Sequence, residues 1–229
     1  MKFSLEIRLH QIKQQYDDRL LTFLTIMLML LMFVLVPLQA EFVFVEVFAI
    51  IAGVALIGSA LVISGSTAVF IILMTAFLMN VVVVILRALH DPSLTHLYLL
   101  ASSWLIFTIT LGWVVAHAVF GPGRVNYHRI IGAVFLYLLI ALAFSSLFIF
   151  VGLLIPNAFS GIKFQDSPAL ASQLFYFNFV TLTSVGYGDI VPVHPIARSL
   201  SNLETILGQF YPATLLARLV TLEREGRPE

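Results

Sequence analysis

Long apolar segments, interrupted by short polar ones, are the feature that most constrains how this chain can fold. The hydrocarbon core of a bilayer is about 30 Å thick, and a helix of about 20 apolar residues crosses it. Measured in this way, the 229-residue sequence holds six candidate spans. They cover residues 20–38, 43–63, 67–88, 97–119, 129–155 and 195–220. The sequence therefore predicts an all-α integral membrane protein with six transmembrane helices.

The composition agrees with a membrane protein and excludes several other classes. Hydrophobic residues make up 60% of the chain and charged residues 10%, against about 25% charged residues in an ordinary soluble domain. The formal net charge is zero, so no nucleic-acid partner is expected. Cysteine is absent, which excludes disulfides and thiolate metal sites. Because the sequence also lacks metal-ligand spacing, a nucleophile elbow and a phosphate loop, we expect neither an enzyme nor a cofactor.

The basic residues indicate the orientation of the six predicted spans. Lys and Arg favour the cytoplasmic side of a membrane. With the N-terminus inside, most of them fall on the inner side: Lys2, Arg8, Lys13, Arg19, Arg124, Arg129, Arg218, Arg224 and Arg227. Arg87, Lys163 and Arg198 fall outside. We therefore expect a multi-pass protein of the cell membrane with both termini in the cytoplasm, ending in a short tail over residues 221–229.

Residues 1–19 precede the first span and are too polar for the apolar core of a signal peptide, so the first span is expected to be retained. Leu5, Leu9, Ile12 and Tyr16 form a helical stripe among basic residues. Such a segment suits an amphipathic helix lying on the lipids of the inner leaflet. The alternative is a frayed polar tail.

The segment between the fifth and sixth spans is too elaborate for a simple loop. Ser167 is a good N-cap, and Pro168 suits the first position of a helix. The apolar residues 169–182 that follow are too few to cross a bilayer. We expect a short re-entrant helix here, followed by an extended strand. Non-helical backbone at membrane depth must be buried in protein or line a cavity, so the strand is expected to line something wet.

Glycines at alternate positions give that strand an unusual property. Gly186 and Gly188 can adopt left-handed backbone that other residues avoid. Successive carbonyl groups can then turn to one side of the strand, where a ring of several strands would replace the water around a cation. The C-terminal end of the preceding helix carries partial negative charge, which also favours a cation.

The residues TSVGYGD, at positions 183–189, resemble the selectivity filter of tetrameric potassium channels, whose backbone carbonyls coordinate the ion. The resemblance covers a pore domain over residues 129–220. It implies an outer helix 129–155, a pore helix 169–182, a filter 184–188 and an inner helix 195–220.

The resemblance also implies roles for individual residues. Potassium ions would be held by the carbonyls of Val185, Gly186 and Tyr187 and by the carbonyl and hydroxyl of Ser184. Gly188 would close the outer mouth. The residues that would support the filter are Thr183, Asp189 and a cuff of Tyr176 and Phe177 around the Tyr187 ring.

Ser184 departs from the family, which usually has Thr at this innermost position. Serine keeps the hydroxyl but lacks the methyl group that restricts the rotamer of Thr, so looser ion binding is expected there. The sequence still predicts a potassium-selective channel that conducts passively. A weakly selective cation channel is one alternative, and a non-conducting membrane subunit that binds a partner is another.

The inner helix contains three gating candidates. Gly208 is either a hinge or a site of close helix packing, and Pro212 removes a helical hydrogen bond one turn later. Glu204 is either a cation-attracting or proton-sensitive group, or a structural tie to Thr181 or Thr183. We expect Gly208→Ala to shift the open probability and to leave ion preference unchanged.

Residues 20–120 form a predicted four-helix region that lacks a voltage sensor. In six-span relatives the fourth helix carries regularly spaced arginines, whereas span 97–119 contains no Lys or Arg. Steep voltage dependence needs about 3–4 gating charges per subunit. Arg87 and Asp91 are too few for this role and are expected to pair with each other. Because one filter strand cannot encircle an ion, a homotetramer around a central pore is expected, with potassium ions and membrane lipids as its partners.

Overall fold

The computed structural model describes residues 20, 22–35, 44–89, 93–121 and 127–225. The predicted interfacial helix over 1–19 lies outside the described residues. Residues 22–30 are α-helical, and η1 (Leu31–Leu35) continues them with the wider turn of a π-helix. The next four helices along the chain are α3 (Phe44–Ser64), α4 (Thr67–Leu89), α5 (Leu94–Phe120) and α6 (Tyr127–Leu154).

The rest of the chain contains one helix of 15 residues, one helix of 31 residues and two strands of two residues each. In chain order they are β1 (Phe159–Ser160), α7 (Pro168–Leu182), β2 (Val191–Pro192) and α8 (Pro195–Glu225). The structure is therefore almost entirely helical over the described residues, and the prediction of an all-α architecture is confirmed. Since α8 continues to Glu225, the first part of the predicted tail over 221–229 is helical.

Three helices in the described part of the chain are long and apolar enough to cross a membrane. They cover Thr67–Arg87, Leu94–Phe120 and Arg129–Leu154. Apolar helices suit a bilayer because they satisfy their own backbone hydrogen bonds. The start of α5 is set by Ser93, whose hydroxyl accepts a hydrogen bond from the Thr95 N–H at 3.3 Å. This cap explains why α5 begins before the predicted position 97.

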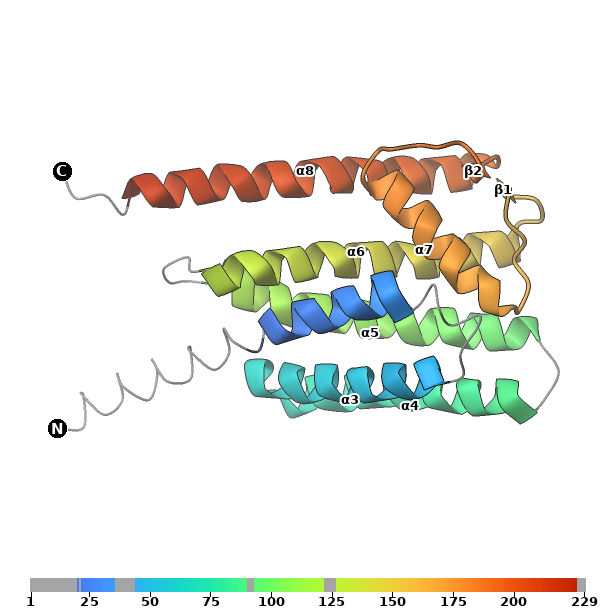
Figure 1. Cartoon of the computed structure of the whole chain (residues 1–229), viewed down its shortest axis with the longest axis horizontal. Helices are drawn as coiled ribbons and strands as arrows, with labels where there is room; N and C mark the ends of the chain where they lie inside the picture. Colours follow the sequence, from blue (N-terminus) through green and yellow to red (C-terminus); the bar gives the residue numbers. More distant parts are fainter. Residues whose placement is uncertain (1–19, 21, 36–43, 90–92, 122–126, 226–229) are drawn as a thin grey trace.

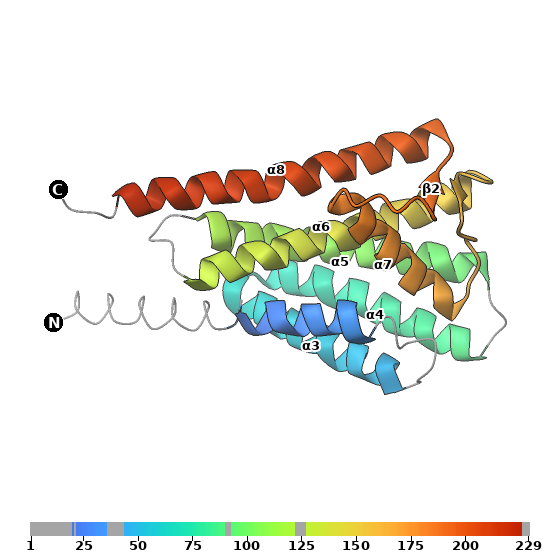
Figure 2. The ribbon, with the colours of Figure 1, turned by 45° about the horizontal axis from the view of Figure 1, so that its top comes forward.

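The helices are stacked in layers, and α6 lies near the middle (Figure 1). On one side it packs against α5, with α3 and α4 beyond; on the other side lie α7 and α8, and Figure 2 shows the same order. One buried cluster joins the first helices to α5 and α6 through residues such as Leu24, Leu73 and Phe135. A second buried cluster, which includes Phe148 and Phe177, joins α6 to α7.

The two short strands pair with each other and hold together the two ends of the segment that contains α7. β1 and β2 are antiparallel, with Phe159 opposite Pro192 and Ser160 opposite Val191. The N–H groups of Val193 and His194 both donate to the Ala158 carbonyl, at 2.8 and 3.1 Å. The chain therefore leaves this point, forms α7, and returns to it. Figure 1 shows α7 running obliquely from that end of the molecule towards the middle of α8.

Asp166 connects the front helices to the start of α7. Its carboxylate pairs with the Arg87 guanidinium at the end of α4, and its second oxygen lies 3.4 Å from His96 Nδ1 on α5. Arg87 thus pairs with Asp166, whereas the expected pairing of Arg87 with Asp91 lies outside the described residues. The contact is tertiary, because it brings the end of α4 beside the loop before α7.

Candidate functional site

The start of α7 follows the sequence prediction. Ser167 is the N-cap with extended backbone, and Pro168 occupies the first helical turn, where a missing N–H costs nothing. The Ser167 hydroxyl makes no capping hydrogen bond. The cap therefore sets the direction in which the chain enters α7, and the proline stiffens the first turn.

The C-terminus of α7 is closed by Ser184. This residue has a φ of 59°, in the left-handed region. Its N–H donates to the Thr181 carbonyl at 3.0 Å, and the Val185 N–H donates to the Val180 carbonyl at 2.9 Å. The two bonds form a Schellman motif, which satisfies the last carbonyl groups of a helix through a left-handed residue. A left-handed serine is not expected from the sequence, because glycine usually occupies such a position.

Left-handed backbone then recurs at every second residue. Gly186 has a φ of 61° and Gly188 a φ of 82°. Among the described residues, no hydrogen bond is accepted by the carbonyl oxygens of residues 184–187. All of residues 183–189 are exposed in the single chain. A strand with free, accessible carbonyl groups can bind a cation, because those oxygens have no other partner to lose.

Tyr187, between the two glycines, stacks on Tyr176 of α7. The two ring centroids are 6.2 Å apart and the ring planes are nearly parallel, at 1°. The Tyr176 hydroxyl also hydrogen-bonds to the Asp189 carboxylate, and this bond raises the pKa of Tyr176. One tyrosine of α7 thus contacts both the side chain in the middle of the segment and the acid at its end.

Phe177 lies elsewhere. Its ring is 4% exposed and makes edge contacts with Phe148 and Phe159, at centroid distances of 5.1 and 5.7 Å. Within one chain, Phe177 therefore packs against Phe148 and Phe159, and the described ring contacts do not join it to Tyr187. Successive residues of a helix point about 100° apart. Tyr176 consequently faces the 183–189 segment, while Phe177 anchors α7 to α6 and β1.

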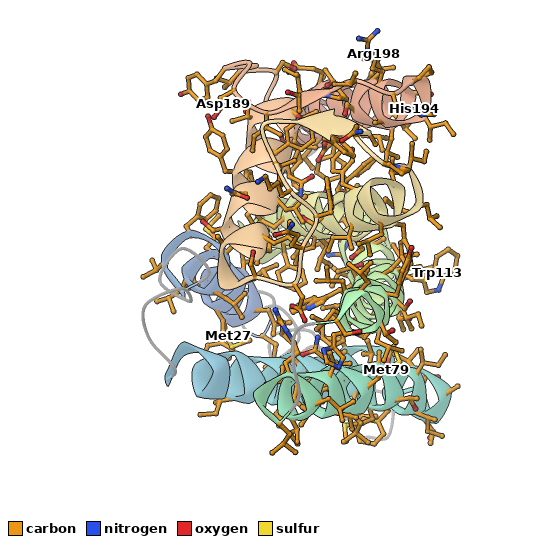
Figure 3. All side chains as sticks on the ribbon, turned by 90° about the vertical axis from the view of Figure 1, so that its right-hand side faces the viewer. Met27, Met79, Trp113, Asp189, His194 and Arg198 are labelled. Carbon is orange, nitrogen blue, oxygen red and sulfur yellow. The ribbon has the colours of Figure 1, made fainter. Side chains whose placement is uncertain are left out.

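Gly161 supports the Asp189 end of the segment, and sequence reasoning missed it. It has a φ of 86°, and a Cβ atom at this position would overlap the Asp189 carbonyl oxygen. The backbone of Asp189 therefore approaches that of the loop after β1 more closely than any side chain allows. Figure 3 shows Asp189 at the α7–α8 edge of the molecule, where His194 and Arg198 also lie.

The C-terminal end of α7 packs against the middle of α8. The Thr205 hydroxyl donates to the Thr181 carbonyl at 3.3 Å. One turn later, a Cβ atom on Gly208 would overlap the Leu182 carbonyl oxygen. The helix α8 continues without a break through both Gly208 and Pro212. This geometry supports the packing interpretation of Gly208, because the contact requires a residue without a side chain.

Glu204 is buried, and it is not the tie that sequence reasoning considered. Its side chain is 0% exposed, and both carboxyl oxygens lack a partner among the described residues. The Thr181 carbonyl is contacted by Thr205 instead, and the Thr183 hydroxyl donates to Phe179. A buried carboxyl without a partner is far less costly as the neutral acid.

A further contact to the segment comes from Gln209, which sequence reasoning also missed. Its amide Nε2 donates to the Ser184 hydroxyl oxygen at 2.8 Å. Tyr211, next but one along α8, donates its hydroxyl to the Ala133 carbonyl of α6 at 2.8 Å. The middle of α8 is therefore connected to both the 183–189 segment and α6.

The comparisons with known proteins agree with this arrangement. Residues 135–225 match the model of a family described as ion channel. The match begins within α6 and extends to the end of α8, so it includes α7 and the glycine motif. No curated protein matches the chain. The apolar helices indicate a membrane protein, and residues 135–225 are similar to the ion channels of that family.

Proposed function

We propose that the protein is a potassium-selective channel, formed by four copies of the chain around a central pore. The proposal is carried by one observation: the alternation of left-handed residues at Ser184, Gly186 and Gly188 in an exposed strand with free carbonyls. The ligands would be the carbonyls of Val185, Gly186 and Tyr187, with the carbonyl and hydroxyl of Ser184. Backbone oxygens at such positions replace the water shell of a potassium ion.

The exposure of the segment supports an assembly of several chains. In the single chain Tyr187 is 71% exposed, although an aromatic ring of this size is normally buried. Large apolar side chains also line one stripe of α8: Ile196, Leu203, Ile206 and Phe210 are all exposed. Four copies arranged around an axis would cover this stripe and bring four strands together.

Conduction in this arrangement requires no chemical step by the protein. A potassium ion would lose water as it enters, exchange between successive carbonyl layers, and move down its electrochemical gradient. The helix α7 ends at Leu182, two residues before Ser184, so the partial negative charge of its C-terminus favours a cation at the inner entrance. Since α5 contains no Lys or Arg, gating by a mobile arginine helix is not part of the proposal.

The remaining expectations form part of the same proposal. The pore domain would comprise α6, α7, the 184–188 strand and α8, and the front helices would form a separate four-helix region. The strand would face the outer side of the cell membrane, and both termini would be cytoplasmic. Potassium ions and membrane lipids would be its partners, without a resident cofactor or nucleic acid.

Potassium flux into liposomes that contain the purified protein tests the proposal. Gly186→Ala should reduce the flux at least tenfold, since a left-handed alanine costs about 1–2 kcal/mol in each of four strands. Within one chain, a Cβ atom on Gly186 would meet no described atom within 4 Å, so there the change acts on the backbone. Gly58→Ala, in open space on α3, is the matched control and should conduct normally. Flux that survives Gly186→Ala would exclude the carbonyl mechanism.

Reversal potentials measured with potassium on one side and sodium on the other separate the alternatives. A value close to the potassium equilibrium potential supports the proposal. A reversal potential close to zero identifies a weakly selective cation channel. The presence of Ser184, where the resembled family usually has Thr, would favour that outcome. A folded tetramer that carries no current would indicate the non-conducting partner subunit.

A further inference from the structure

The Ser184 hydroxyl has a partner from a distant part of the chain. Gln209 lies 25 residues later, on an exposed face of α8, and its amide Nε2 is 2.8 Å from the Ser184 Oγ. The bond joins the inner helix directly to the first residue of the proposed filter. No other side chain in the described residues hydrogen-bonds to a residue between Ser184 and Gly188.

The position of Gln209 is fixed by contacts that flank it. Thr205 donates to the Thr181 carbonyl, and Gly208 approaches the Leu182 carbonyl so closely that a Cβ atom would overlap it. Tyr211 is bonded to the Ala133 carbonyl on the other side. Because these three contacts fix the position of α8, they also fix the position of the Gln209 amide relative to Ser184.

The hydrogen bond from Gln209 restricts the rotamer of the Ser184 hydroxyl. A serine oxygen has two lone pairs and one proton, and it rotates about χ1 more freely than a β-branched threonine. An amide N–H directed at one lone pair selects the rotamer and leaves the second lone pair for another partner. The hydrogen bond thus supplies the restriction that the methyl group of threonine would provide.

We propose that Gln209 is a positioning residue for ion selectivity: it orients the Ser184 hydroxyl so that the free lone pair faces the permeating ion. This inference rests on the proposed function of the 184–188 strand. It explains how the chain keeps an ordered innermost site with serine in place of threonine. Four copies of the bond would be present in the tetramer.

The test compares potassium and sodium permeability in Gln209→Met, which has a similar length and no donor. One lost hydrogen bond per subunit should lower the permeability ratio roughly three- to tenfold. Asn202→Leu, an exposed amide elsewhere on α8, is the matched control and should keep the ratio of the unmodified protein. If the methionine variant does not assemble, Gln209→Leu is read in the same way.

Rescue distinguishes orientation of the hydroxyl from a merely structural role. Ser184→Thr in the Gln209→Met background should restore the ratio, because threonine restricts its own rotamer. An unchanged ratio in Gln209→Met, or a lowered ratio that Ser184→Thr does not restore, would overturn the inference. Neither outcome affects the proposed function, which fails only if the unmodified protein carries no potassium or if Gly186→Ala conducts.

Discussion

Three residues of the 183–189 segment need left-handed backbone, and only two of them are glycines. Ser184 adopts a φ of 59° because it closes the Schellman motif of α7, whose two hydrogen bonds offset the cost of about 1–2 kcal/mol for a residue with a side chain. The conformation of Ser184 is thus imposed by the end of the helix. Gly186 and Gly188 have no such support, so the freedom of their own backbone is essential.

Tyr176 permits a prediction at the same scale. Its pKa is raised by the hydrogen bond to Asp189, so the neutral, donating form is favoured in the folded protein. The contribution of this bond is therefore complete at neutral pH and is lost only as the pH rises above the ordinary range of tyrosine. Tyr176→Phe keeps the ring that stacks on Tyr187 and removes the hydroxyl.

We expect Tyr176→Phe to shorten single-channel openings several-fold, because Asp189 loses its tie to α7 while the carbonyls of the strand keep their places. Ion preference should stay unchanged. Tyr98→Phe on α5 is the control, since its ring contacts Phe150 and its hydroxyl has no partner among the described residues. Open times equal to those of the unmodified protein would show that the bond does not support the strand.

At the scale of elements, the contact between α7 and α8 connects the strand to the helix that would gate it. Gly208 lies against the Leu182 carbonyl, and Pro212 lacks the N–H that would bond to the Gly208 carbonyl. The close contact and the missing hydrogen bond fall within one turn. A hinge at Gly208 would therefore have to move the surface on which α7 rests.

Gly208→Ala tests this arrangement. The new methyl group would overlap the Leu182 carbonyl and push α8 away, which costs about 1–3 kcal/mol. Because Gln209 moves with α8, we expect both a lower thermal stability in detergent and a lower potassium preference. Gly112→Ala is the control, since its Cβ atom would lie at an ordinary 3.7 Å from Leu136. A simple hinge would instead change open probability and leave ion preference intact.

Arg87 and Asp166 join the front helices to α7, and their pairing has a measurable energy. The Asp166 side chain is only 3% exposed, so Arg87→Gln would leave a buried carboxylate without its cation. Breaking such a pair costs about 3–5 kcal/mol, reduced here because Arg87 is partly exposed. We expect a clearly lower unfolding temperature for Arg87→Gln. Arg198→Gln should change the unfolding temperature little, because the Arg198 side chain is exposed and, among the described residues, bonds to the Pro192 carbonyl alone.

The elements that sequence reasoning predicted well are those determined by neighbours along the chain. Apolar length places the helices, Ser167 and Pro168 place the start of α7, and the glycine spacing predicts left-handed residues at 186 and 188. The contacts of Gln209 and Arg87 join residues 25 and 79 positions apart, and no local pattern signals such pairs. The burial of Phe177 likewise depends on Phe148, which lies on another helix.

At the scale of the whole molecule, a single chain leaves residues 183–189 and the apolar stripe of α8 exposed. The carbonyls of residues 184–187 and the apolar stripe of α8 have no partner among the residues of one chain that the structure describes. Closed rotational symmetry is the usual way in which identical chains cover such surfaces. In the proposed tetramer, four chains would also give a potassium ion a ligand from each side at every layer of the strand.

Mixed assembly tests this requirement for four chains. If unmodified and Gly186→Ala subunits are folded together in equal amounts and a single altered strand blocks a pore, only pores with four unmodified subunits conduct. The flux should then fall to about one sixteenth of that of the unmodified protein, against about one quarter for a dimeric pore and one half for independent subunits. The Gly58→Ala subunit, mixed in the same way, should leave the flux unchanged, because its substitution lies in open space. A fall to one half would mean that each chain conducts alone, and the ring of carbonyls would then have to be abandoned.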